Sequence, residues 1–158
     1  MAGKNSSFMA EAVRLSEHGM RLGDGGPFGA VIVRKGRIIG TGWNRVLATN
    51  DPTAHAEITA IRDACRAVSS YRLEGCTIYV NCEPCPMCLA AIYWAGIEKV
   101  VFAATREDAG QIGFIDAKLY REICLPDKQR TMKIKREDTS AALKIMAQWP
   151  TLDGRRDY

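Results

Sequence analysis

Apolar residues recur along this chain with two kinds of spacing, and each kind predicts a different element. Helical spacing between turn residues predicts helices over 8–22, 54–68, 86–95, 117–123 and 139–149. Runs of β-branched and aromatic residues predict strands over 30–33, 37–40, 77–81, 99–103 and 131–135. Lys35 and Gly36 lie between the first two strands, which is the signal of a compact hairpin.

This order of elements indicates an α/β fold. A hairpin followed by alternating helices and strands places helices on both faces of a mixed sheet. Residues 23–27, Gly-Asp-Gly-Gly-Pro, end the first helix, and Thr53 is a predicted cap of the next one. The sequence contains no internal repeat, low-complexity tract or linker, so residues 1–158 are expected to form a single domain.

The composition is ordinary for a folded domain in water. The 158 residues are 47% hydrophobic and 25% charged, and a domain of this length buries roughly 70% of the surface of its unfolded chain. No run approaches the ~20 apolar residues that a membrane span requires. The opening residues, MAGKNSS, lack an apolar signal core, so we expect a cytoplasmic protein without membrane contact.

Positive charge is scattered along the chain. The net charge is +4, and the densest basic runs, 128–136 and 155–156, have acidic residues nearby. A dedicated nucleic-acid binder usually concentrates its charge on one face. We therefore expect a small-molecule substrate in preference to a nucleic acid.

The six cysteines divide into isolated residues and a cluster. Cys65, Cys76 and Cys124 stand alone in apolar surroundings and are predicted to be small core residues. The other three fall between residues 82 and 88. In a cytoplasmic chain such clustering favours a metal site over disulfides.

His55 and Glu57 complete a set of groups suited to hydrolysis. A hydrolytic zinc site has three protein ligands and a water, whose pKa the metal lowers towards ~7. Cys85 and Cys88 lie on one face of a helical turn near its N-terminus, where thiolates are stabilised. His55 is the third predicted ligand, and Glu57 is predicted to carry protons. The only other histidine, His18, has no partner at ligand spacing and is predicted to be structural or exposed.

This H-x-E…P-C-x-x-C pattern is the signature of zinc-dependent nucleobase deaminases. Two other uses of the cysteines stay open. A lone C-x-x-C also occurs in redox-active motifs, and Cys82 as a fourth ligand would close the site and make the zinc structural. In that case the chain would be a zinc-stabilised binding module. Cys82 ends a strand whereas Cys85 opens a helix, so we expect the Cys82 thiol to point elsewhere.

The chain resembles the cytidine deaminase-like superfamily, and more narrowly the small bacterial guanine deaminases. The resemblance rests on residues 25–33, 50–57, 82–95, 112–116 and Tyr158, and it covers nearly the whole chain. It implies a three-layer α/β/α sandwich around a mixed five-stranded sheet. It also implies one zinc ion per subunit and hydrolysis of guanine to xanthine and ammonia, with Glu57 as the catalytic residue that protonates a ring nitrogen and then the departing amine.

A base pocket and its closure are further implications of the resemblance. The positions that match pocket residues are Phe28, Asn44, Ala56, Trp94, Asp116 and Tyr158. Residues 150–158 would form a C-terminal tail that closes the active site and is exchanged between the subunits of a homodimer. The aromatic positions also suit a core, Asn44 and Asp116 also suit caps of a turn or helix, and Tyr158 also suits a frayed terminus.

The substrate stays open within the deaminases. Residues 104–110 depart from the guanine deaminase pattern just before Asp116, so guanosine, an aminotriazine or another aminopurine are alternative substrates. Cytosine and tRNA adenosine deaminases share the zinc motif. A tRNA enzyme would need a basic surface and a pocket open to a flipped nucleotide, whereas this chain has an aromatic C-terminal residue that would cap a small pocket.

Overall fold

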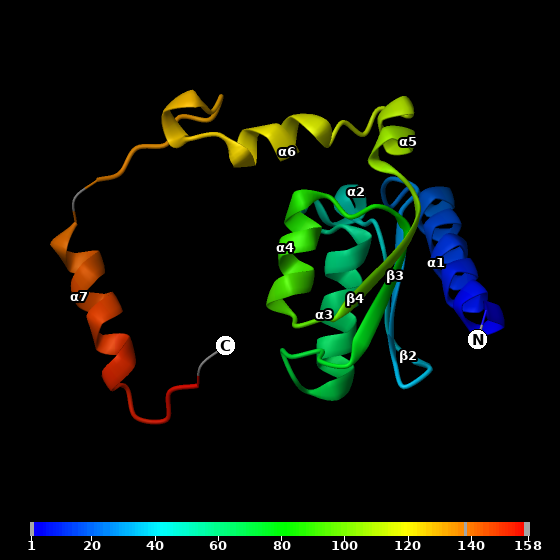
Figure 1. The fold of residues 1–158 in the computed structure, drawn as a ribbon, viewed down its shortest axis with the longest axis horizontal. Coiled ribbons are helices and arrows are strands. Elements are labelled where there is room, and N and C mark those ends of the chain that lie inside the picture. Colours follow the sequence, from blue (N-terminus) through cyan, green and yellow to red (C-terminus); the bar gives the residue numbers. More distant parts are fainter. Residues whose placement is uncertain (1, 138, 157–158) are drawn as a thin grey trace. The chain divides into compact units, whose positions relative to one another are not determined.

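The computed structural model describes residues 2–137 and 139–156, which divide into two compact units that meet at Arg121 and Glu122. The first unit contains four strands: β1 Gly29–Arg34, β2 Arg37–Trp43, β3 Cys76–Cys82 and β4 Lys99–Ala104. They form one sheet in the order β2-β1-β3-β4 (Figure 1). β1 pairs antiparallel with β2 and β3, whereas β3 and β4 are parallel, so the sheet is mixed as predicted.

Helices cover both faces of this sheet. Those of the first unit are α1 Ala2–Leu22, α2 Val46–Thr49, α3 Ala56–Val68, α4 Pro86–Trp94 and α5 Arg106–Gln111, and α6 Ala117–Cys124 crosses the boundary between the units. α1 lies on one face, and α3 and α4 lie on the other (Figure 1). Within the described residues, no helix is both long enough and apolar enough to cross a bilayer.

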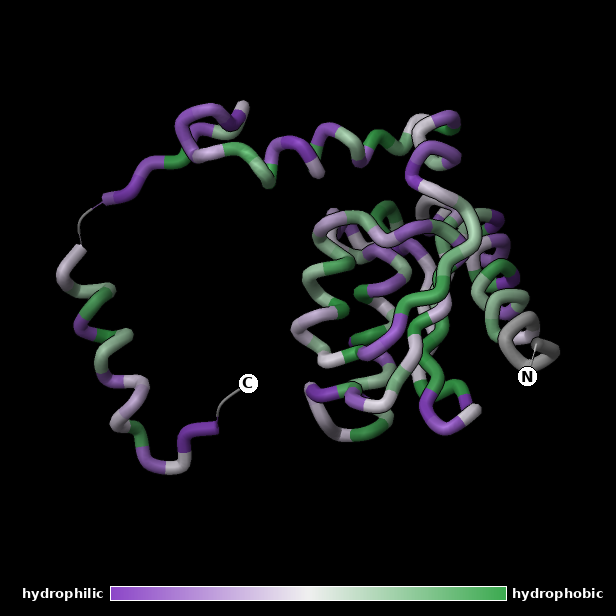
Figure 2. The backbone as a smooth tube through the Cα atoms, viewed as in Figure 1, coloured by the Kyte–Doolittle hydropathy of each residue, from purple (hydrophilic) through white to green (hydrophobic). Residues whose placement is uncertain are grey.

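The two faces of the sheet have separate hydrophobic clusters. Ala30 and Ile32 of β1 pack in the cluster that includes α3. Val31 and Val33 of the same strand pack in the cluster that includes Leu15 of α1. A strand buried on both faces needs apolar residues at every position, which explains the continuous run over 30–33, and Figure 2 shows hydrophobic residues along the central strands.

Helix α3 lies unusually close to β2 because both surfaces consist of the smallest residues. A Cβ added at Gly42 would lie 2.4 Å from the carbonyl oxygen of Ala56, and one added at Gly40 would lie 2.6 Å from the Cβ of Ala64. Ala56, Ala60 and Ala64 are buried and stand one turn apart along the helix. Since no side chain separates the two backbones, the sheet fixes the position of the first turn of α3 directly.

The structure corrects several predictions. The sheet has four strands among the described residues, not five, because residues 131–135 form no strand. Their alternation of lysine with apolar residues suits a strand edge, but a strand needs a partner, and no described strand pairs with them. The N-cap of α3 is His55, not Thr53, whose hydroxyl bonds to the Asp51 carboxylate instead. Cys76 is buried as predicted, whereas Cys65 is half-buried and Cys124 is exposed.

The second unit contains short helices and exposed apolar side chains. Its elements are η1 Asp127–Gln129, α7 Ser140–Gln148 and η2 Trp149–Thr151. The Arg130 guanidinium donates hydrogen bonds to backbone carbonyls of residues 122–125. None of its described residues is buried, and Leu143, Ile145 and Met146 of α7 are all exposed.

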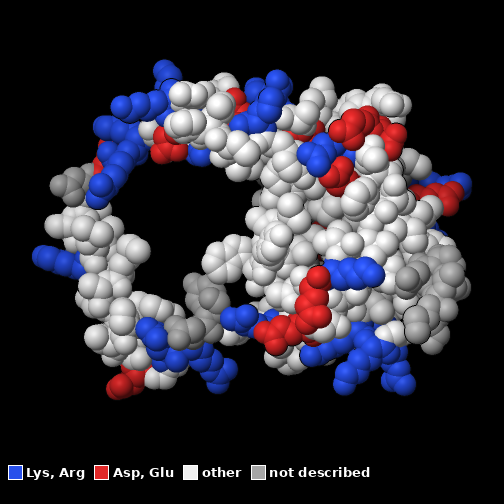
Figure 3. All heavy atoms as spheres, in the orientation of Figure 1, with Lys and Arg blue, Asp and Glu red and all other residues white. Residues whose placement is uncertain are grey.

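Charged side chains of both signs lie on the surface of the protein (Figure 3). On the face of the first unit that Figure 3 shows, Lys and Arg occupy separate places with Asp and Glu between them. In the second unit, Lys and Arg recur through residues 128–136.

Candidate active site

Two helices of the first unit begin at residues that the sequence predicts to bind metal. His55 is the N-cap of α3 and Cys85 is the N-cap of α4. Both have the same extended backbone, with φ −68° and ψ 161° for His55 and φ −68° and ψ 168° for Cys85. Neither side chain caps its helix. These positions usually carry Ser, Thr, Asp or Asn, so the chain gives up two caps and leaves both side chains available for other bonds.

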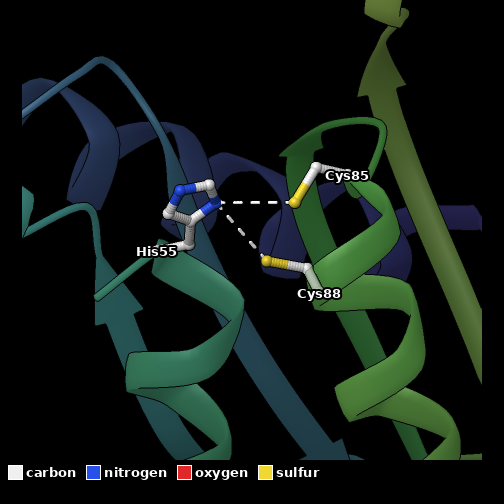
Figure 4. A group of neighbouring side chains, drawn as sticks. All are labelled: His55, Cys85 and Cys88. Carbon is white, nitrogen blue, oxygen red and sulfur yellow. Dashed lines mark hydrogen bonds between the residues drawn. The ribbon is translucent and has the colours of Figure 1, made fainter. Parts of the chain in front are cut away.

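The His55, Cys85 and Cys88 side chains point toward one another across the gap between α3 and α4 (Figure 4). His55 Nδ1 lies 3.6 Å from Cys85 Sγ and 3.5 Å from Cys88 Sγ. Tetrahedral bonds of ~2.3 Å to sulfur and ~2.0–2.1 Å to nitrogen would place such donor atoms about 3.6 Å apart. Among the described residues, these three form the group whose donor atoms could hold a metal ion, and the donor set fits zinc.

The thiols of this group share their protons unequally. A hydrogen bond with Cys88 lowers the pKa of Cys85 to about 4, and the same bond, with burial, raises the pKa of Cys88. The hydrogen bond to Cys85 also raises the pKa of His55. The Cys85 thiolate attracts a cation, and a bound metal ion would displace the protons of Cys88 and His55, because these ligands bind metal in their deprotonated form.

Cys82 lies apart from this group, as predicted. Its Sγ contacts the carbonyl oxygen of Thr105 at 3.6 Å, and burial raises its pKa to about 11. What excludes Cys82 as a ligand is its position, because its sulfur is not among the donor atoms that lie within 4.8 Å of one another. The site therefore has three protein donors and the open character of a catalytic zinc site, not the closed character of a structural one.

Glu57 is the second residue of α3 and is buried, with only 7% of its surface exposed. Burial raises the pKa of its carboxyl group to about 7. It lies in the first turn of the helix that His55 caps, and both residues line the same cavity. A carboxyl group whose pKa suits proton transfer near neutral pH thus lies in the same cavity wall as His55 and Cys85.

The cavity has a volume of about 310 Å³. Of the residues predicted to line a base pocket, four do so: Phe28, Asn44, Ala56 and Asp116. Sequence reasoning missed other lining residues, including Leu47, Pro52, Asn81 and Phe114. They lie far apart in the sequence and share no spacing that could have revealed them.

Asn44 is only 5% exposed and is held from two sides. Its Oδ1 accepts a hydrogen bond from the Val46 N–H at 3.2 Å, and a Cβ at Gly25 would lie 2.0 Å from the same oxygen. The predicted capping role is therefore confirmed, and it uses one of the two lone pairs of the oxygen. The Nδ2 group is the part of the amide that can still donate to a ligand.

An aromatic wall forms where Phe28 meets Phe114. The two rings pack edge-to-face with centroids 4.7 Å apart. A Cβ at Gly26 would lie 2.7 Å from Phe114 and 2.9 Å from Phe28, so only glycine leaves room for both rings. Asn81 fixes this segment to β3, because its amide accepts from the Gly29 N–H and donates to the Pro27 carbonyl.

The remaining predicted site residues differ in their placement. Asp116 lines the cavity, and burial raises the pKa of its carboxyl group. Trp94 is not among the described lining residues. It ends α4, is 72% exposed, and stands roughly 9 Å along the helix from Cys88 and roughly 14 Å from Cys85. Tyr158 lies outside the described residues. His18 is exposed and packs edge-on against Trp43.

Comparison with known families agrees with this geometry. Residues 2–104 match the model of the cytidine and deoxycytidylate deaminase zinc-binding region. The chain belongs to this family. It is accordingly a zinc-dependent hydrolytic deaminase, as the H-x-E…P-C-x-x-C pattern predicts.

Individual relatives extend the likeness beyond the zinc-binding region. Guanine deaminase of Bacillus subtilis is 45% identical over 154 residues, which is 98% of this chain and 99% of that protein. The X-ray structure of that enzyme matches with a TM-score of 0.93 and covers 97% of this chain and 98% of its own. A tRNA-specific adenosine deaminase of Buchnera aphidicola is 37% identical and covers 85% of each chain.

Proposed function

We propose that this deaminase converts guanine to xanthine and ammonia, with His55, Cys85 and Cys88 as ligands of one zinc ion per subunit. The observation that carries the proposal is that these three donors lie together, and that two of them, His55 and Cys85, line one cavity with the buried Glu57. The substrate is supported by the full-length similarity to a guanine deaminase. The proposed reaction would belong to the breakdown of purines.

Glu57 is the proposed catalytic residue. A zinc ion held by His55, Cys85 and Cys88 would supply a positive charge that makes a water acidic enough to attack near neutral pH. Glu57 takes a proton from the attacking water and passes it to the ring nitrogen beside the carbon that carries the amine. Glu57 then takes the proton of the hydroxyl group that attack has added to this carbon and gives it to the amine. The carbon–nitrogen bond breaks as the new carbonyl forms, so that guanine and water become xanthine and ammonia. Burial of Glu57 limits exchange of these protons with solvent.

The cavity wall can recognise a flat purine. Phe28, with Phe114 packed edge-on against it, supplies an apolar surface for the base. Asn44 Nδ2 is positioned by the bond of its Oδ1 to Val46 and donates to the carbonyl of the base. Asp116 accepts from a ring N–H or from the amine, and the small Ala56 leaves space for the ring.

A second copy of the chain is the proposed source of the rest of the site. Trp94 and its neighbour Tyr93 are 72% and 77% exposed, and α7 exposes a row of apolar residues. We propose a homodimer that exchanges its C-terminal segments, in which residues 150–158 of one chain, with Tyr158, close the site of the other. Trp94 stands too far from the cysteines of its own chain to touch the same base, so its role belongs to the assembled dimer. The domain 1–158 would then complete its active site only with a partner.

The C-terminal exchange can be tested by complementation. A full-length Glu57→Gln chain is mixed and refolded with a chain that ends at residue 149. If the tails are exchanged, the mixed dimer contains one intact Glu57 site closed by one intact tail, and it regains activity that neither parent has. Absence of activity in a verified mixed dimer would show that each tail serves its own chain.

Zinc-loaded Glu57→Gln tests the mechanism itself. We expect kcat on guanine to fall by about 10²- to 10⁴-fold, because the proton carrier is lost, while one zinc per chain remains bound. Glu11→Gln is the matched control, since Glu11 is a surface carboxylate paired with Arg14 on α1. Release of ammonia by Glu57→Gln at nearly the wild-type rate would refute the role and favour a structural zinc.

The substrate is tested separately on the wild-type protein. Ammonia release is measured with guanine, guanosine, adenine, cytosine, an aminotriazine and tRNA. Turnover of tRNA adenosine in place of guanine would indicate the activity named for the Buchnera aphidicola relative, a tRNA-specific adenosine deaminase, and not that of the Bacillus subtilis guanine deaminase. Turnover of another small amine would retain the proposed site and replace the substrate.

The absence of disulfides among the six cysteines supports, in addition, a reducing compartment such as the cytoplasm.

A further inference from the structure

The two residues that precede Cys85 are held by side chains from α5 and α6. The Glu83 carboxylate accepts hydrogen bonds from the Arg106 backbone N–H and from Arg106 Nε, both at 3.1 Å, and pairs with Arg106 Nη2. The Tyr120 hydroxyl donates to the Pro84 carbonyl oxygen at 2.8 Å. Arg106 in turn lies over the Tyr120 ring, 4.2 Å from its centroid.

These contacts form a closed circuit: Arg106 holds Glu83, Tyr120 holds Pro84, and Arg106 packs on Tyr120. A two-point contact between guanidinium and carboxylate fixes orientation as well as distance. Glu83 and Arg106 are partly buried, at 18% and 35% exposure, so the pair is less open to water than the ion pairs on α1. The arrangement therefore restrains the segment more than a surface ion pair would.

Pro84 makes this restraint important for the next residue. Proline has no N–H, so its carbonyl is the only backbone group through which residue 84 can be held. Tyr120 binds that carbonyl. No residue intervenes between Pro84 and Cys85, whose side chain makes no cap bond to hold it in place. The orientation of the Pro84–Cys85 peptide consequently sets where Cys85 Sγ lies relative to His55 and Cys88.

We propose that Arg106 and Tyr120 are positioning residues of the metal site, which act through Glu83 and Pro84 to keep Cys85 in place and so retain the zinc ion. The inference rests on the proposed zinc ligands. It adds that the lifetime of the bound metal depends on residues that touch neither metal nor substrate. Residues that support metal ligands in this way typically change metal affinity 10- to 100-fold when replaced.

The test is the rate at which full-length, zinc-loaded protein releases its metal to an excess of a chromogenic chelator. Arg106→Met should release zinc about tenfold faster or more. Arg106→Lys should release zinc at an intermediate rate, since lysine keeps the positive charge but cannot make the two-point contact with the Glu83 carboxylate. Arg14→Met is the matched control, because Arg14 also makes two bonds to a carboxylate, at 2.7 and 2.8 Å, on the exposed surface of α1. It should release zinc at the wild-type rate.

Two further measurements separate positioning from general stability. Tyr120→Phe removes one hydrogen bond and preserves the ring, so it tests the circuit even if Arg106→Met folds poorly. It should also speed zinc release, with an unchanged melting temperature, and activity lost in either variant should return when zinc is added. Wild-type release rates in both Arg106→Met and Tyr120→Phe would overturn the proposal. A wild-type protein that retains no zinc would instead overturn the proposed metal site.

Discussion

Replacing Gly42 with alanine tests whether close packing of α3 on β2 sets the geometry of the active site. The new Cβ would lie 2.4 Å from the carbonyl oxygen of Ala56 and 2.5 Å from the amide nitrogen of Ala60. Both are backbone atoms, so no side-chain rotation relieves the clash. Ordinary contact begins near 3.4 Å, and the first turn of α3 must therefore move by about 1 Å. That turn carries Glu57 and begins at His55.

Two magnitudes follow from this displacement. Overpacking of a core costs ~1–3 kcal/mol, against ~0.4–1 kcal/mol gained because alanine restricts the unfolded chain. The expected net loss of about 1–2 kcal/mol lowers the melting temperature by about 2–8 °C in a domain of this size. A misplacement of about 1 Å also costs activity of order 10²-fold. Activity should therefore fall by more than the loss of stability explains.

The assay combines thermal unfolding with kcat/KM on guanine, measured well below the melting temperature. Gly110→Ala is the control, since a Cβ there meets nothing within 4 Å and Gly110 lies in helix α5. It should be neutral or slightly stabilising. A Gly42→Ala protein with wild-type activity and stability would refute the claim that this contact fixes α3, because it would show that the helix adjusts without consequence.

The other predictions concern the cavity wall. Phe114→Ala should raise KM for guanine by about 2- to 10-fold with little change in kcat, because an aromatic pair contributes ~0.5–1.5 kcal/mol and Phe114 supports Phe28. Steady-state kinetics measures both constants, and an unchanged KM would contradict the prediction. Asp116→Asn should lower kcat/KM by about 10- to 100-fold yet raise the melting temperature at pH 7. Burial raises the folded-state pKa of Asp116, so its ionised form destabilises the fold at neutral pH. That cost, and the gain in melting temperature from Asp116→Asn, should vanish below about pH 4, where the carboxyl is protonated in both states. Melting temperatures measured against pH would contradict this reasoning if the gain were larger at acidic pH than at neutral pH.

The parts of the molecule with local signals were predictable from the sequence. Residues 30–33 form an unbroken apolar run because β1 is buried on both faces, and such a run predicts a strand by itself. The predicted metal donors also have a local pattern, since two of them lie three residues apart and the third precedes Glu57 by two positions. Helix α5 is absent from the predicted elements, although Thr105 and Asp108 form a capping box, which is a sequence signal of a helix start.

What depends on distant contacts could not be predicted in this way. Residues 131–135 have the alternation of a strand, but pairing is decided by a neighbouring edge and not by the segment itself. Phe114 enters the cavity wall because it meets Phe28, more than 80 residues earlier in the chain. Gly40 and Gly42 resemble turn residues in the sequence, and only the approach of α3 reveals why they lack side chains.

The metal-donor group and part of the cavity wall come from different kinds of structure. His55, Glu57 and Cys85 stand at the starts of two helices, whereas part of the wall comes from connections at 25–28 and 112–116. Connections tolerate replacement far better than helices that are packed against a sheet. A descendant gene could therefore drift in two short loops and acquire a new amine as substrate, while it inherits the hydrolytic chemistry unchanged.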